Sequence, residues 1–167
     1  MTRHFSIARL SLALLAMLAL AGTAAAERQE NQERQEPFKG VIEAVSDNEI
    51  HFPTMSVHLT GGGAATHLGQ YTFTLEGTVD LRNGTGVGSA EFVAANGDSI
   101  YTTFVGQGVP TGGTPTENRV TETYTIVGGT GRFAGAGGSF KMVRLLDTAT
   151  EETSGSFAGT ISFANGE

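Results

Sequence analysis

The chain has 167 residues, with 10 Lys and Arg against 17 Asp and Glu, which gives a net charge of −7. This acidic balance excludes the electrostatic footprint that binds nucleic acid or anionic lipid. The absence of cysteine excludes disulfides and thiolate metal sites. Composition alone identifies neither a ligand nor a reaction.

The first 26 residues are expected to form an export signal. Arg3 and Arg9 give a basic start, an apolar run covers Leu10 to Leu20, and Ala24 and Ala26 are the small residues that a signal peptidase requires. This run is too short to cross about 30 Å of hydrocarbon, so we expect no membrane span. The sequence predicts a secreted or periplasmic protein, cleaved after Ala26, with 167 − 26 = 141 residues left for one domain.

A short polar segment separates this signal from the folded domain. Residues 27–36 contain no apolar side chain, and Pro37 disfavours helix at the residue before it. We therefore expect residues 27–37 to form a disordered tether, and residues 38–164 to form the folded domain.

In the folded domain, apolar side chains recur with a period of two, which is typical of half-buried antiparallel strands. The turn pairs Asn83-Gly84 and Asn96-Gly97 suit tight hairpins, and residues 110–115 (PTGGTP) are expected to form a loop. No segment has a helical period. The expected strands cover residues 38–45, 50–59, 71–81, 92–93, 100–109, 120–127, 139–146 and 154–163.

This strand spacing is typical of a sandwich or a barrel, which periodicity alone does not separate. Glycines inside the strands favour the barrel, because tight coiling needs positions without a Cβ. We therefore predict an all-β fold, a single eight-stranded antiparallel barrel. The glycines in question are Gly77, Gly88, Gly106, Gly108, Gly155 and Gly159.

The most distinctive run is Ile126 to Ala136 (IVGGTGRFAGA). It contains the spacing of a dinucleotide motif, but no helix N-terminus follows to receive a pyrophosphate. We expect instead that Gly128, Gly129 and Gly131 form a wide connection between two strands. Phe133 is expected to plug one end of the barrel.

This run resembles the glycine motif (GGTG-x-F-x-x-A) of the dirigent and allene oxide cyclase superfamily, whose members are eight-stranded barrels with an apolar central cavity. The run at residues 155–159 (GSFAG) is similar to the closing strand of bacterial relatives. The resemblance implies a secreted barrel of bacterial type, and it leaves a homo-oligomer open. The matching residues are Gly128, Gly129, Thr130, Gly131, Phe133 and Ala136.

The resemblance has two limits. After Ala136 the chain has Gly137-Gly138, where plant dirigent proteins carry Arg-Gly. No catalytic residue of the superfamily lies within the matched motif, so none is transferred to this chain.

Two charged residues on apolar strand faces are the first candidates for a site. A hairpin closed symmetrically about Phe133 would place Glu122 opposite Arg144. A buried pair of this kind must be matched, because an unpaired buried charge is costly. It could orient a carbonyl or hold an anion. Alternatively, these faces point outward, or the pair is a structural bridge near the rim.

The remaining candidates also lie on apolar strand faces. Glu43, between two valines, is a weaker third candidate for catalysis. Tyr124, Phe140 and Met142 share faces with the charged pair and are candidate ligand contacts.

No motif implies a metal or a cofactor. His51, His58 and His67 match no short metal-ligand spacing, and no serine stands in a complete nucleophile motif. The resemblance, the aromatic strand faces and the lack of a complete catalytic motif together lead us to expect an exported barrel that binds a small apolar molecule in its lumen. The resemblance also implies an alternative, a cofactor-independent cyclase or isomerase, and a non-catalytic envelope or matrix role is a third.

Overall fold

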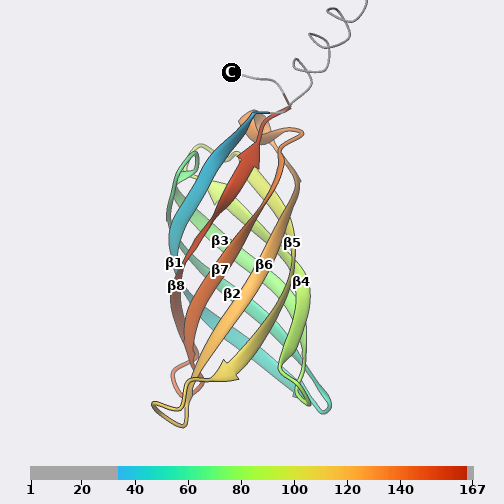
Figure 1. Ribbon diagram of the computed structural model, residues 1–167, viewed down its shortest axis with the longest axis vertical. Helices are drawn as coiled ribbons and strands as arrows, with labels where there is room; N and C mark the ends of the chain where they lie inside the picture. The colour runs from blue at the N-terminus through green and yellow to red at the C-terminus, as the bar shows by residue number, and fades with distance from the viewer. Residues whose placement is uncertain (1–33, 165–167) are drawn as a thin grey trace, which may run out of the picture. The chain divides into compact units, whose positions relative to one another are not determined.

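A computed structural model describes residues 34–164, which form a closed, all-antiparallel barrel of eight strands (Figure 1). Neighbouring strands follow chain order, and β8 closes the barrel against β1. This confirms the predicted fold class. The expected signal peptide and residues 27–33 lie outside the described residues. The elements are β1 (Gln35–His51), β2 (Thr54–Ala65), β3 (Gly69–Asp80), β4 (Thr85–Ala94), β5 (Ser99–Pro110), β6 (Glu117–Gly129), a 3-10 helix η1 (Gly131–Phe133), β7 (Gly137–Asp147) and β8 (Glu152–Ser162).

Two boundaries differ from expectation. β1 begins at Gln35, which pairs with Ser162, so residues 35–37 belong to the barrel rather than to the tether. The strand expected over 50–59 is interrupted at Phe52 and Pro53, where the chain turns from β1 into β2. Pro53 has no backbone N–H to donate to a neighbouring strand, so a turn suits it better than a strand interior.

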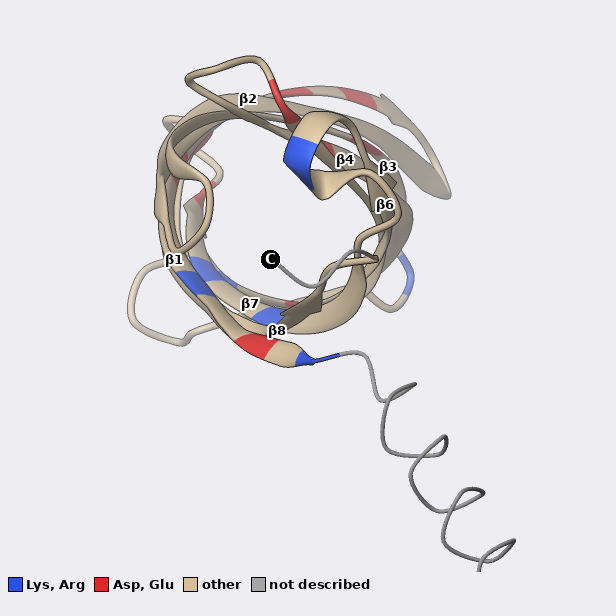
Figure 2. Ribbon diagram, turned by 90° about the horizontal axis from the view of Figure 1, so that it is seen from above, with Lys and Arg blue, Asp and Glu red and all other residues tan. Residues whose placement is uncertain are grey.

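The two ends of the barrel carry different connections. The turns at residues 52–53, 81–84, 111–116 and 148–151 lie at one end, the lower end in Figure 1, which we call the open end. η1 lies at the opposite end, which we call the plugged end. Figure 2 views the barrel along its axis from the plugged end and shows the strands closing into a ring. Across residues 34–164, no helix is long and apolar enough to cross a membrane.

Aromatic side chains fill the lumen towards the plugged end. Phe133 is fully buried and stacks on Phe163, with 6.2 Å between the ring centroids. Deeper in the lumen, Phe92 meets Phe140 edge-on at 5.7 Å, and Tyr124 stacks on Phe140 at 4.8 Å. Rings packed at these distances bury large apolar areas and add favourable edge and stacking contacts. This half of the lumen is a packed core.

The glycine motif forms the connection that carries Phe133. Gly131 has a φ of +55°, a conformation that a residue with a Cβ adopts only at a cost. Gly129 is constrained by packing instead, because a Cβ there would lie 2.7 Å from the Cβ of Phe133. Thr130 ties the connection to β5: its N–H donates to the Ser99 carbonyl at 2.8 Å, and its hydroxyl accepts from the Ser99 N–H at 2.8 Å.

These contacts predict that the motif serves folding. Phe133→Ala should cost about 3–5 kcal/mol of unfolding free energy, because it empties a fully buried site. Gly131→Ala should cost about 1–2 kcal/mol through its positive φ, and Gly129→Ala should destabilise through its close contact with Phe133. Urea denaturation measures all three. Phe52→Ala, at a side chain that is 77% exposed, is the matched control and should change stability by less than about 0.5 kcal/mol. Three motif variants as stable as the wild type would contradict this interpretation.

Candidate functional site

The β6–β7 hairpin joins the two charged candidates in a different register from the predicted one. Glu122 pairs with Met142, and Arg144 pairs with Val120. The predicted register was wrong by two residues, because Phe133 is the last residue of η1 and the hairpin is centred on the residue before it. A shift by two residues keeps each side chain on its face of the sheet. Both charged side chains therefore still point into the lumen.

Glu122 and Arg144 form a buried ion pair on the diagonal between the two strands. The side chains are 3% and 7% exposed. Arg144 Nη2 donates to Glu122 Oε1 at 2.8 Å, and Nε donates to Oε2 at 3.1 Å, which is the bidentate geometry of a strong pair. The Tyr124 hydroxyl donates to Oε2 at 3.2 Å. Arg144 Nη1 donates to the Thr153 hydroxyl at 3.2 Å, which in turn donates to the Leu145 carbonyl.

Burial and charge fix the protonation of this network. Burial, and then the negative charge of Glu122, raises the pKa of Tyr124 well above its usual value, so its hydroxyl keeps the proton that it donates. Burial by itself lowers the pKa of Arg144, but the hydrogen bonds and charge of Glu122 outweigh burial and raise it. Arg144 therefore stays charged, and the carboxylate that it binds neutralises it.

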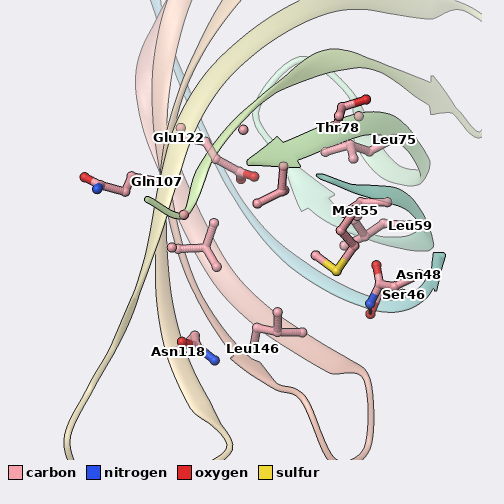
Figure 3. A pocket seen from close by; sticks show the side chains of 18 of the residues that line it. Ser46, Asn48, Met55, Leu59, Leu75, Thr78, Gln107, Asn118, Glu122 and Leu146 are labelled. Carbon is pink, nitrogen blue, oxygen red and sulfur yellow. Dashed lines mark hydrogen bonds between the residues drawn. The ribbon is translucent and has the colours of Figure 1, made fainter. Parts of the chain in front are cut away.

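A cavity of about 270 Å³ runs from this ion pair towards the open end of the barrel (Figure 3). Glu122 and Arg144 form part of its wall, and most of the remainder is apolar. The cavity is larger than the engineered cavity of ~150 Å³ that holds a benzene molecule. We call the following residues the apolar wall: Met55, Leu59, Leu75, Phe104, Val120 and Leu146.

Inward-facing glycines leave the space that becomes this cavity. A Cβ at Gly77 would lie 2.8 Å from the ring of Phe104, so the ring rests on the bare backbone. A Cβ at Gly106 would lie 2.5 Å from Cγ of Glu122, which occupies the space in the same way. At Gly108 nothing fills the space, since the nearest atom to a Cβ there would be 3.8 Å away. Of the three glycines, Gly108 is therefore the one that leaves part of the lumen hollow.

The other predicted site residues lie outside this cavity. Tyr124, Phe140 and Met142 point into the lumen, but they belong to the packed half and do not border the cavity. Glu43 is exposed on the outer wall, because alternation along β1 places Ile42 inside. Glu43 was therefore wrongly grouped with the lumen candidates.

His51 and His58 lie on neighbouring strands but are not paired with each other. His51 lies beside Glu49, with 2.9 Å between Nε2 and Oε1, and His58 lies 4.0 Å from Glu76. Within the described part of the chain, no three His, Asp or Glu side chains are grouped as metal ligands would be.

No protein-family model and no curated protein matches the sequence. Among solved structures, the barrel is similar to the pterocarpan synthase dirigent protein GePTS1, with a TM-score of 0.55 and 10% sequence identity over 98% of each chain. An identity this low shows the fold alone. The chain has a dirigent-like barrel, the fold that its glycine motif indicated.

The ion pair predicts a specific pattern of stability. Arg144→Met should cost about 3–5 kcal/mol, because it leaves the Glu122 carboxylate buried without a partner. The double variant Glu122→Gln/Arg144→Met should recover much of that loss, since neither charge remains. Urea denaturation at neutral pH measures both variants.

The control is Lys141→Met, which removes an exposed positive charge from the same strand and should change stability by less than about 0.5 kcal/mol. A double variant as unstable as Arg144→Met would show that the cost does not come from an unpaired charge.

Proposed function

We propose that this protein binds a small, uncharged and largely apolar molecule in the open half of its lumen. The observation that supports this most directly is the unequal filling of one barrel. Aromatic rings pack the plugged half, while glycines and the apolar wall enclose a cavity of about 270 Å³ in the other half. Small-molecule sites are typically concave and mostly apolar, with a few placed polar groups, and this cavity has that composition.

The charges that border the cavity favour an uncharged ligand. Both oxygens of Glu122 already accept hydrogen bonds from Arg144, and Oε2 also accepts one from Tyr124. The pair is neutral as a unit, so it offers no free counter-charge to an ion. A charged ligand would lose its hydration without gaining a partner, which is unfavourable in a buried site.

The proposal also includes the compartment in which the barrel acts. The signal expected over residues 1–26 would place the barrel outside the cytoplasm, as a secreted or periplasmic protein of bacterial type. An acidic, cysteine-free domain does not depend on disulfides in that compartment. In that compartment the barrel would bind its ligand as a monomer or as a homo-oligomer.

A cyclase or isomerase is the second candidate, and one observation favours it. Glu122 and Arg144 converge on a cavity, as an acid–base site would require. GePTS1 is named as a synthase, but a likeness of 10% identity does not extend its reaction to this chain. Because both oxygens of Glu122 already accept hydrogen bonds from Arg144, binding is the better supported function. NMR spectroscopy of a ligand before and after incubation separates the two: an unchanged spectrum supports binding, and the spectrum of an isomer supports catalysis.

A cavity-filling substitution tests the binding site. Gly108→Phe should weaken saturable binding of 2-naphthol by at least about tenfold, because the new side chain points into the cavity with no backbone clash at its Cβ. Val109→Phe is the matched control, since the adjacent side chain is 45% exposed on the outer face. Fluorescence titration measures both variants. Equal affinity in the wild type and Gly108→Phe would place the probe elsewhere, and no saturable binding to the wild type would refute the proposal.

A further inference from the structure

One polar atom at the cavity has no partner within the protein. Asn48, on β1, lines the cavity, and its Oδ1 is buried without a hydrogen bond. Among the described residues, it is the one buried side-chain nitrogen or oxygen in this condition. In Figure 3, Asn48 and Glu122 lie on different sides of the cavity, with Met55 between them. A buried acceptor left unpaired is unfavourable, so its persistence beside a cavity needs a reason.

The hydrogen bonds of Ser46 orient the Asn48 amide, with Nδ2 towards Ser46 and Oδ1 away from it. Asn48 Nδ2 donates to Ser46 Oγ at 3.0 Å, and the Ser46 hydroxyl donates its own proton to the Glu151 carbonyl at 3.2 Å. In this arrangement Ser46 Oγ accepts from Asn48. Turning the amide over would require the Ser46 hydroxyl to give up its bond to the Glu151 carbonyl. The unpaired group is thus an acceptor.

The Glu122–Arg144 network donates no hydrogen bond to Asn48 Oδ1. Arg144 is the strongest donor at the cavity, but it directs Nε and Nη2 to Glu122 and Nη1 to Thr153. The rest of the boundary consists of the apolar wall and a few polar side chains, none of which donates to Asn48 Oδ1. A hydrogen bond to Asn48 Oδ1 can therefore come from a molecule in the cavity.

We infer that the ligand is an uncharged apolar molecule that carries a hydroxyl or N–H group, and that Asn48 Oδ1 accepts the hydrogen bond from this group. The inference rests on the proposed binding function and names the chemical class of its ligand: an alcohol, phenol or amide rather than a hydrocarbon or a carboxylate. Asn48 is then a specificity-determining residue. A site with a buried acceptor rejects a molecule that lacks the donor, because the acceptor is left unpaired.

A pair of matched probes tests this. 2-Naphthol and 2-methylnaphthalene share one ring system and differ by a hydroxyl in place of a methyl group. Fluorescence titration of the wild type and of Asn48→Leu gives the ratio of their dissociation constants, methyl over hydroxyl, for each protein. The difference in hydration between the probes cancels when the two ratios are compared. We expect this ratio to fall by about tenfold or more in Asn48→Leu.

Two further variants keep the test independent of a general effect on packing. Asn48→Ala removes the same oxygen without adding bulk and should lower the ratio in the same direction. Asn118 pairs with Leu146 at the edge of the same cavity, and neither of its amide atoms is buried without a partner. Asn118→Leu should therefore change the ratio by less than about twofold. A thermal melt should confirm that Asn48→Leu folds, since the substitution removes the Nδ2 hydrogen bond to Ser46 Oγ together with the unpaired oxygen.

The outcomes separate the two claims. If 2-methylnaphthalene binds saturably while the ratio stays within about twofold of wild type in both Asn48 variants, the inference is overturned and the binding function stands. A drop of similar size in Asn118→Leu would also overturn it, because the effect would not belong to Asn48. If neither probe binds to the wild type, both the function and the inference fail.

Discussion

An eight-stranded barrel encloses a narrow lumen that the side chains of its own strands can fill, so the identity of the inward-facing residues decides whether that lumen is solid or holds a cavity. Here the inward positions are unevenly occupied along the barrel axis. Rings such as Phe92 and Phe140 fill the half beneath Phe133. In the other half, inward-facing positions on β3, β4 and β5 are glycines without side chains. Neighbouring side chains fill only part of the space that this leaves.

The buried ion pair marks the boundary between the two halves. Glu122 faces both environments, since it accepts from Tyr124 in the packed core and also borders the cavity. Burial of two charges is tolerated because each meets several partners in good geometry. The pair thereby brings polarity to the inner wall of an apolar cavity without bringing net charge. This combination supports the proposal that the site binds neutral molecules.

Much of the fold could be predicted from the sequence, because a period of two is strong wherever apolar and polar residues contrast. The strand over residues 71–81 is the clearest example, and the structure places β3 at Gly69–Asp80. The same signal carries no information on pairing, so the β6–β7 register depended on an assumed midpoint that η1 displaces. The inward direction of Glu122 and Arg144 was left open for the same reason.

Asn48 was missed for a related reason. Ser46 and Asn48 continue the inward face that Ile42 and Ala44 begin on β1, but their polarity removes the contrast on which alternation depends. A polar residue at an inward position looks like a loop residue in the sequence. The inward glycines were recognised as signs of a barrel, yet which of them are covered by a neighbouring side chain depends on contacts between strands. Residues such as Phe104 could therefore not be assigned to the site in advance.

The pairing of Gln35 with Ser162 places both termini of the sheet at the same end of the barrel. The first and last residues of the sheet lie side by side at the plugged end, whereas the cavity reaches the turns at the other end. A surface or fusion partner joined to either terminus of the sheet would thus attach at the end away from the cavity. Immobilised barrels would all be held by the same end, with their open ends turned towards the solution.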